Sequence, residues 1–197
     1  MVVFVLYCQA DLEGIESVSL SKDSNLCFSV RNPQDVNEVR EKVVVDSTVL
    51  EVSSVADHEK HRDETPSHFA MKWKDATHRS TLRILGSNSF LNETKNENDK
   101  KTKKNKHISN ELQKAIDAVR SMTSEDSGHL VPMLALDCNG LEPYAFHPMG
   151  VQGEFVVVTK QAGGKKIDTV DLSDGDWADY AMDIGSVSIT NFTAKFQ

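Results

Sequence analysis

Short runs of apolar and β-branched residues recur along most of the chain, and polar or glycine-containing turns separate them. Apolar and polar positions alternate within many of these runs, which is the period of a half-buried β-strand. In the first part of the sequence the pattern predicts strands at residues 2–10, 26–31, 41–52, 68–74 and 80–85, the last two as a hairpin. In the second part it predicts strands at residues 130–137, 144–147, 154–160, 167–172 and 186–196. The last of these loses its alternation near Asn191, where we expect an irregularity.

One segment, residues 109–122, has helical periodicity. Ser109 is a suitable N-cap, and apolar side chains follow at helical spacing at Leu112, Ala115, Ile116, Val119 and Met122. We expect this stripe to pack on the body of the protein. The preceding residues 92–107 contain six lysines and no aliphatic or aromatic residue, which is typical of a linker that does not join a packed core.

Two segments at opposite ends of the chain are similar. Residues 6–18 read LYCQADLEGIESV and residues 134–146 read LALDCNGLEPYAF, and each runs from an apolar strand into a turn, at residues 11–14 and 140–143. We interpret this as an internal duplication. Together with the strand pattern and the single helical stripe, the duplication predicts an all-β, mostly antiparallel fold with two similar halves, packed sheet on sheet or barrel-like, plus one inserted helix. The expected organisation is an N-terminal β half (1–91), a linker with the helix (92–129) and a C-terminal β half (130–197).

Composition narrows the classes of partner. The net charge is −8, which argues against a nucleic-acid interface or an anionic membrane surface, because both need clustered Lys and Arg. No run approaches the roughly 20 apolar residues of a membrane helix, so no membrane insertion is expected. The first residues lack the basic region of a signal peptide. Cys8, Cys27 and Cys138 are scattered and form no CxxC pair, so we expect a reduced, cytoplasmic protein.

Histidines gather in one part of the chain. His58, His61 and His68 lie among acidic residues at positions 57–68, and this loop is a candidate for metal handling. The sequence HEKH is not the HExxH arrangement of a metalloprotease, and the segment has no apolar periodicity that would hold a helix. A solvated loop is therefore favoured over a metal site.

The acidic residues near the end of the chain are a second candidate. Six aspartates lie within residues 168–183, but the glycine and the distal glutamate of an EF-hand loop are missing. We expect an exposed acidic loop at residues 173–183, around Trp177 and Tyr180. The chain has no G-x-S-x-G, Walker or Rossmann fingerprint, so no catalytic residues are assigned, no cofactor is expected and an enzyme is the less favoured interpretation.

Several motifs together resemble one known family. They include Gly140-Leu141-Glu142-Pro143 with Phe146 and Pro148, Asp176-Trp177 with Asp179 and Tyr180, and Met71-Lys72-Trp73-Lys74. In these motifs the chain resembles the eukaryotic family called CXXC motif containing zinc binding protein. The resemblance covers most of the chain except residues 92–128, and it implies a mostly β fold with two similar halves and no firmly assigned catalytic activity. It also implies a link to copper-chaperone and mitochondrial biology.

The chain departs from the family at the zinc site. Members carry two CxxC pairs in neighbouring loops, and the resemblance assigns their four positions to Asn32, Asp35, Trp73 and Ala76. Structural zinc needs four soft or borderline ligands, and only Asp35 ligates well. We therefore expect that no metal is bound there and that Trp73 and Ala76 replace the metal by apolar packing.

These observations lead to three hypotheses. The first is a non-enzymatic protein-interaction or scaffold protein with unknown protein partners, whose candidate binding surface comprises Glu142, Asp176, Trp177, Asp179 and Tyr180. The second is a metal-handling protein that uses the histidine loop at residues 57–68. The third is a small enzyme with a pocket between the two halves, for which the sequence names neither a nucleophile nor a substrate.

Overall fold

The computed structural model describes residues 2–21, 24–51, 66–85, 110–160, 164–181 and 185–197. The first part of the chain forms β1 (Val2–Glu13), β2 (Ile15–Leu20), β3 (Asn25–Arg31), β4 (Val39–Asp46), β5 (Phe69–Met71) and β6 (Ser80–Leu85). Then come the helix α2 (Asn110–Ala118), β7 (Met122–Thr123) and the 3-10 turn η1 (Ser124–Asp126). The second part forms β8 (Val131–Asn139), β9 (Glu142–Phe146), β10 (Phe155–Thr159), β11 (Lys166–Val170), β12 (Trp177–Ala181) and β13 (Gly185–Phe196). Among the described residues, the predicted all-β, mostly antiparallel fold with one α-helix is confirmed.

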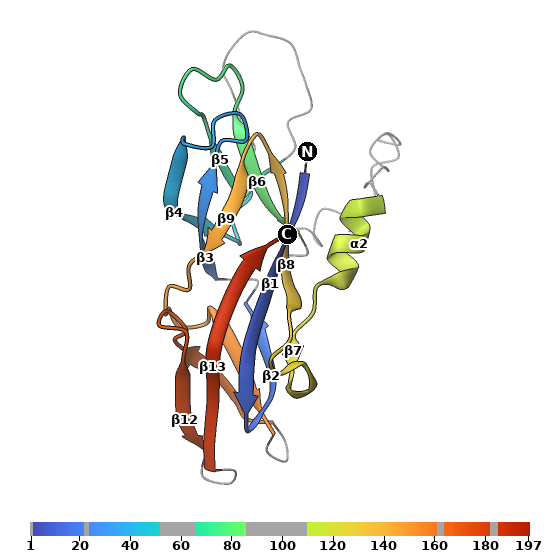
Figure 1. Cartoon of the computed structure of the whole chain (residues 1–197), viewed down its shortest axis with the longest axis vertical. Helices are drawn as coiled ribbons and strands as arrows, with labels where there is room; N and C mark the ends of the chain where they lie inside the picture. Colours follow the sequence, from blue (N-terminus) through green and yellow to red (C-terminus); the bar gives the residue numbers. More distant parts are fainter. Residues whose placement is uncertain (1, 22–23, 52–65, 86–109, 161–163, 182–184) are drawn as a thin grey trace, which may run out of the picture.

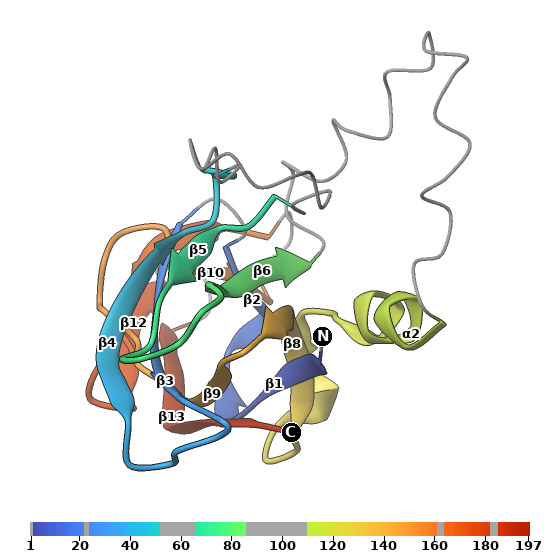
Figure 2. The ribbon, with the colours of Figure 1, turned by 90° about the horizontal axis from the view of Figure 1, so that it is seen from above.

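The strands form three sheets whose order has a two-fold pattern (Figures 1 and 2). In the six-stranded sheet, β12-β13-β1-β8-β6-β5, the strands β1 and β8 are central and one hairpin lies on each edge. The other sheets have the orders β11-β10-β2-β7 and β4-β3-β9, so β2 joins the β10–β11 hairpin and β9 joins the β3–β4 hairpin. Each sheet therefore combines strands from both parts of the chain. This order is compatible with an internal duplication, which stays a prediction, as does the division at residues 91 and 130.

The two central strands both end at a glycine in the left-handed region, Gly14 with φ 67° and Gly140 with φ 71°. The turns predicted at residues 11–14 and 140–143 are shorter in the structure, because β1 continues through Glu13 and β9 begins at Glu142. Pro143 is thus a strand residue, which is tolerated because β9 lies at the edge of its sheet.

The sheets enclose one main core, which contains a chain of aromatic contacts. The ring centroids of Phe28 and Phe146 lie 5.8 Å apart, those of Phe146 and Phe155 lie 6.4 Å apart, and those of Phe155 and Phe192 lie 5.4 Å apart. Tilted and edge-to-face pairs of this kind contribute roughly 0.5–1.5 kcal/mol each beyond their burial. Because these residues come from β3, β9, β10 and β13, the contacts join all three sheets.

The helix α2 packs beside β1 and β8 (Figure 1). Leu112 forms a small buried cluster with Leu85 and Ala135, and Ala115, Ile116 and Val119 of the predicted stripe pack against it, as expected. The helix ends at Ala118, however, so the prediction that it includes Met122 is wrong. Met122 lies on β7, paired with β2, because strand pairing overrides its helical spacing. No helix in the described part of the chain combines the length and the apolar composition that a membrane crossing requires.

Part of the segment expected to be an acidic loop, residues 177–181 with Trp177 and Tyr180, is in fact the strand β12, so that part of the prediction is wrong. It pairs with β13 along its whole length, from Trp177 opposite Ile189 to Ala181 opposite Gly185. The aspartates obscure any apolar alternation in this segment. Long-range pairing decides its conformation, rather than local composition.

The irregularity predicted near Asn191 is confirmed as a β-bulge. The β1–β13 register shifts there, and Asn191 has φ 55°. Before the bulge Val187 and Ile189 are buried, and after it the more buried positions are Phe192 and Ala194. The extra residue changes the alternation by one position, so both sets of side chains face the core.

Candidate functional site

Two neighbouring loops lie at one end of the molecule (Figure 1). One carboxylate links them. One loop joins β3 to β4 and the other joins β5 to β6. Glu38, in the first loop, accepts hydrogen bonds from Nδ2 of Asn32 and from the backbone N–H of Lys74, both at 2.7 Å. Each of these bonds uses a different carboxylate oxygen, so Glu38 connects its own loop to the second one through charge-assisted bonds.

Both loops contain a tight turn. The Asp35 N–H donates to the Asn32 carbonyl at 3.2 Å, and the Ala76 N–H donates to the Trp73 carbonyl at 3.3 Å. These bonds join residue i to residue i+3, which is the pattern of a β-turn. The four positions assigned to the CxxC pairs are therefore the first and last residues of two turns.

Trp73 fixes the second loop in the core. Its side chain is buried, and its Nε1–H donates to the Gly140 carbonyl at 2.7 Å. The Ser80 hydroxyl donates to the same carbonyl at 2.8 Å. Ala76 packs against the core cluster beside it. The indole thus joins the β5–β6 loop to the turn between β8 and β9.

A polar network that the sequence did not indicate crosses the three-stranded sheet. Ser29 is fully buried, and its Oγ donates to Glu41 at 2.9 Å and lies 2.7 Å from Nε2 of His147. The Tyr144 hydroxyl donates to the other oxygen of Glu41. The hydrogen bonds from Tyr144 and Ser29 hold the pKa of Glu41 below its usual range. The four side chains therefore form one connected chain of hydrogen bonds.

Two irregularities in strand pairing bring this network together. The β3–β4 register shifts between Phe28 and Val30, and the β3–β9 register shifts at Ser29. Lys42, beside the first shift, has φ 51°, and its N–H donates to Oγ of Ser29 at 3.2 Å. Bulges redirect side chains in this way, and no short sequence spacing reveals them. Because Ser29 is buried and its hydroxyl proton is directed at a carboxylate, the network orders the sheet and presents no accessible nucleophile.

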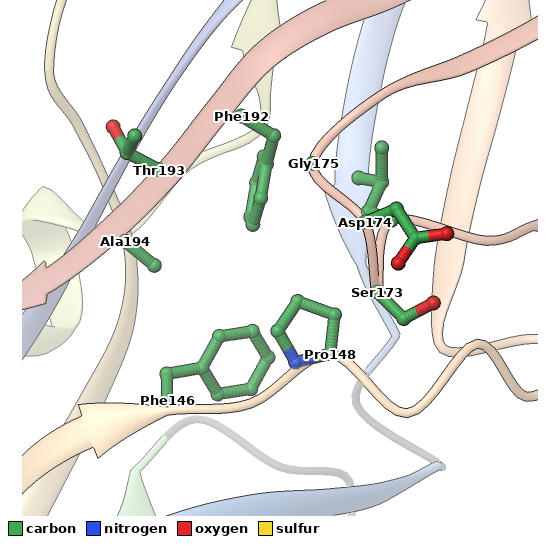
Figure 3. Close-up of a pocket in the computed structure, with 9 residues that line it drawn as sticks. Phe146, Pro148, Ser173, Asp174, Gly175, Phe192, Thr193 and Ala194 are labelled. Atoms are coloured by element: carbon green, nitrogen blue, oxygen red, sulfur yellow. The ribbon is translucent and has the colours of Figure 1, made fainter.

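A shallow pocket lies between β13, the segment after β9 and the loop before β12 (Figure 3). Its volume is about 280 Å³. It is lined by Phe146, Pro148, Leu172, Ser173, Asp174, Gly175, Phe192, Thr193 and Ala194. Figure 3 shows the rings of Phe146 and Phe192 on two sides of the opening, with Asp174 on the facing loop. The pocket is thus apolar inside and acidic at one side.

The predicted binding-surface residues separate into two groups. One group lies on or just before the edge strand β12 and comprises Asp176, Trp177, Asp179 and Tyr180. Tyr180 is 68% exposed, whereas Trp177 is partly buried against the core. Glu142 lies on β9 in a different sheet and forms an ion pair with Arg31. The group on β12 directly follows the pocket loop in sequence.

Of the three candidate metal-binding histidines, His58 and His61 lie outside the described residues. His68 is buried, and its Nδ1 accepts a hydrogen bond from the Ile84 N–H at 3.0 Å. Burial lowers the pKa of His68 to about 4, so the side chain is neutral at pH 7. With one ring nitrogen used by the backbone, His68 has a structural role, and its geometry does not favour the metal-handling hypothesis, which stays a prediction.

The three cysteines are buried. Cys8, Cys27 and Cys138 are all free thiols. Burial raises the pKa of Cys8 to about 12 and also raises that of Cys27 and Cys138. A thiol of this kind is protonated at neutral pH and reacts poorly.

Comparison with known proteins identifies the family. The sequence profile of the eukaryotic family described as "CXXC motif containing zinc binding protein" matches residues 5–197. This chain belongs to that family. Among curated relatives, the UPF0587 protein CG4646 of Drosophila melanogaster is 34% identical over 76 residues. That alignment covers 38% of this chain and 44% of the Drosophila protein, less than half of its length.

Two solved structures share the fold of this family member. A hypothetical protein from Plasmodium falciparum has a TM-score of 0.69 and 18% identity, with 100% of both chains covered. The crystal structure of C1orf123 has a TM-score of 0.71 and 16% identity, with 100% of this chain and 99% of that chain covered. At these identities the likeness concerns the fold alone.

Membership of the CXXC zinc-binding family raises the question of whether zinc fits this chain. A structural zinc site needs four ligands, usually Cys or His, at about 2.0–2.3 Å. Ala76 offers no ligand, and Nε1–H of Trp73 is already bonded to Gly140, which leaves Asp35 as the one strong ligand of the four. These residues do not fit a zinc ion. Elsewhere in the described ranges, no three His, Cys, Asp or Glu side chains lie together as metal ligands.

Proposed function

We propose that this chain is a non-enzymatic protein-interaction protein that keeps the family fold without zinc. The observation that carries the proposal is the connection at the CxxC positions, where Glu38 links the two loops and Trp73 anchors the second. A structural zinc contributes folding energy directly, so other contacts have to offset its loss. Hydrogen bonds to a charged group, at about 1.5–3 kcal/mol each, and a buried indole are contacts of that kind.

The chemistry of the described side chains supports a non-enzymatic function. The pocket lining contains one ionisable side chain, Asp174, and no His, Lys or Cys, which are common bases and nucleophiles in general acid–base and covalent catalysis. The cysteines are buried with raised pKa values, and the Ser29 hydroxyl is bonded to Glu41. Three free, buried thiols also support the expected reducing location, such as the cytoplasm.

The contact surface in this proposal is the edge of the six-stranded sheet at β12. Edge strands leave backbone donors and acceptors unpaired, and exposed tyrosine is common in protein interfaces. Tyr180 is the most exposed of the large hydrophobic side chains among the described residues, at 68%. Asp176 and Asp179 flank Trp177 and make this edge acidic. Glu142 lies outside the contact surface because it is on another sheet.

The proposal that the chain binds no zinc is tested by elemental analysis of the full-length protein, purified without chelators and refolded in excess Zn²⁺. We expect well under one zinc per chain and the same melting temperature with and without EDTA. The control replaces Asn32, Asp35, Trp73 and Ala76 together by cysteine, which restores four thiolates and tests whether the assay detects zinc at this position. About one zinc per wild-type chain, removed by EDTA with a fall in melting temperature, contradicts the proposal.

The interaction part is tested by proximity labelling in the native cell. Tyr180→Ala should reduce labelling of the main partners at least several-fold and leave stability within about 0.5 kcal/mol, because the side chain is mostly exposed. The matched control is Val44→Ala on β4, which is 53% exposed in a different sheet and should leave labelling unchanged. Equal labelling of both variants and wild type would show that β12 is not the contact surface.

A further inference from the structure

The pocket beside β12 has walls that hydrogen bonds hold in place. The Phe192 N–H donates to the Gly175 carbonyl at 2.9 Å, and the Gly175 N–H donates to the Leu172 carbonyl at 3.0 Å. At the bulge, the Asn191 N–H donates to Asp176 at 2.8 Å, and Nδ2 of Asn191 donates to Asp11 at 2.8 Å. The pocket loop is therefore tied to β13 at two points, Gly175 and Asp176. A site whose walls are already ordered loses less entropy on binding.

The interior of the pocket is suited to an apolar side chain. Phe146, Leu172 and Phe192 supply most of its apolar lining, with Pro148 and Ala194 beside them. Sites for small molecules usually enclose about 300–1,000 Å³ and bury most of the ligand. This pocket, at about 280 Å³, is smaller than that range, and it is open rather than enclosed. One side chain of a larger partner therefore fits the pocket better than a free small molecule does.

The charge around the pocket points to the chemistry of that partner. Asp174 lines the opening, and Asp171 and Asp176 flank the same short loop. Hydrogen bonds from Ser173 hold the pKa of Asp171 below its usual range, so its negative charge persists at neutral pH. No Lys or Arg is among the lining residues, and the chain as a whole carries a net charge of −8. Complementary charge favours a basic partner.

We propose that this pocket receives one bulky apolar side chain from an extended segment of a partner protein, with Lys or Arg residues on both sides of it. This inference rests on the proposed interaction function and adds the partner's chemistry to it. The apolar side chain enters between Phe146 and Phe192, and the flanking basic residues meet Asp171, Asp174 and Asp176. The combination gives an apolar anchor with an acidic rim, which is the general arrangement of a binding hot spot.

The test uses a synthetic peptide, acetyl-GKKLKKG-amide, with the full-length protein. Binding is measured by fluorescence polarisation and by backbone amide shifts in NMR. We expect shifts confined to residues 146–148, 172–176 and 191–194. Replacing the leucine of the peptide by serine should weaken binding at least about tenfold, which corresponds to the burial of one leucine. Raising the salt from 50 to 300 mM should also weaken it, because charges are screened.

Two variants of the protein separate the apolar and the charged contributions. Ala194→Leu adds side-chain volume in the pocket and should abolish leucine-dependent binding. Asp174→Lys reverses one exposed charge and should weaken binding about fivefold at low salt. Asp117→Lys, on the helix α2, is the matched control and should leave affinity unchanged. Thermal unfolding shows whether each variant folds. If Ala194→Leu does not fold, Asp174→Lys still tests the proposal.

Three outcomes overturn the inference. These are no binding of the leucine peptide at millimolar concentration, equal binding of the serine peptide, and amide shifts that lie away from the pocket. None of them refutes the interaction function, which depends on labelling that changes with Tyr180. If Tyr180→Ala loses partners while Ala194→Leu and Asp174→Lys keep them, the interaction function stands and the pocket is not its site.

Discussion

The two edges of the six-stranded sheet have the same topology but different packing. On one edge, the segment that enters the β5–β6 hairpin is buried, with Ser67 3% and His68 6% exposed. His68 fills the space next to β6 and bonds the backbone N–H of Ile84. On the other edge, the segment that enters the β12–β13 hairpin leaves an open pocket against Phe192 and Ala194. One edge is closed by side chains of the chain itself, and the other has an open pocket.

The two tryptophans of the chain, one at each edge, differ in burial in the same way. Trp73, after β5, is 4% exposed and donates its indole N–H to a backbone carbonyl. Trp177, at the start of β12, is only partly buried. A buried, hydrogen-bonded aromatic side chain stabilises a fold, whereas a partly exposed one beside an apolar pocket is typical of an interface. The β5–β6 edge thus carries contacts that stabilise the fold, and the binding that we propose is at the opposite, β12 edge of the same sheet.

The largest expected effect concerns these tryptophans. Trp73→Ala should lower the free energy of unfolding by about 3–5 kcal/mol, because it removes a buried indole and leaves the Gly140 carbonyl with one donor fewer. Trp177→Ala should lower it by about 1–2 kcal/mol, since less of its surface is buried. Urea denaturation of both variants measures the difference. Equal losses for the two would remove the contrast between the edges.

The next effect is a pH dependence of the closed edge. His68 has a pKa of about 4 in the folded protein, below the ordinary value of 6.5, because burial disfavours its charged form. The unfolded chain therefore binds a proton between pH 6.5 and 4 while the folded chain does not. At 1.36 kcal/mol per pKa unit, neutral His68 contributes about 3 kcal/mol to the free energy of unfolding above pH 6.5. This contribution is lost as the pH falls to about 4.

The measurement is the free energy of unfolding in urea at several pH values from 7 to 4. His68→Gln should show a shallower loss than wild type over this range, because the titrating group is gone. His78→Gln, at an exposed position in the β5–β6 loop, is the matched control and should follow the wild-type curve. If His68→Gln keeps the full wild-type slope, His68 does not govern the acid sensitivity of this edge.

A smaller effect is expected at the link between the two loops. Glu38→Gln keeps one acceptor oxygen, but its NH₂ group then faces either Nδ2 of Asn32 or the N–H of Lys74. One donor loses its partner in either orientation, which should cost about 1–3 kcal/mol. Amide hydrogen exchange at Lys74 should accelerate as well. Glu125→Gln, an exposed change on η1, serves as the control, and similar losses in the two variants would contradict the proposed role of Glu38.

The sequence predicted the architecture of both edges better than their chemistry. Alternation located most strands, the β5–β6 hairpin and the bulge at Asn191, because the pleat repeats every two residues. It missed β2, the short β7 and β12, and it extended the helix to Met122, which pairs within β7. Glu38 and Lys74 come together only when two loops are folded side by side. The network at Ser29 likewise depends on two register shifts, which no local spacing encodes.

The smallest expected effect tests how the open edge is held. Asp176→Ala removes the acceptor of the Asn191 N–H and should cost about 1 kcal/mol, whereas Asp176→Asn keeps an acceptor oxygen and should stay within about 0.5 kcal/mol of wild type. Hydrogen exchange at Asn191 should accelerate only in the alanine variant. Because Asp176 ties the pocket loop to the bulge, Asp176→Ala should also weaken binding of the GKKLKKG peptide. The loss should exceed that in Asp176→Asn, which removes the same charge but keeps the acceptor. Equal affinities of the alanine and asparagine variants would show that the pocket keeps its shape without this bond.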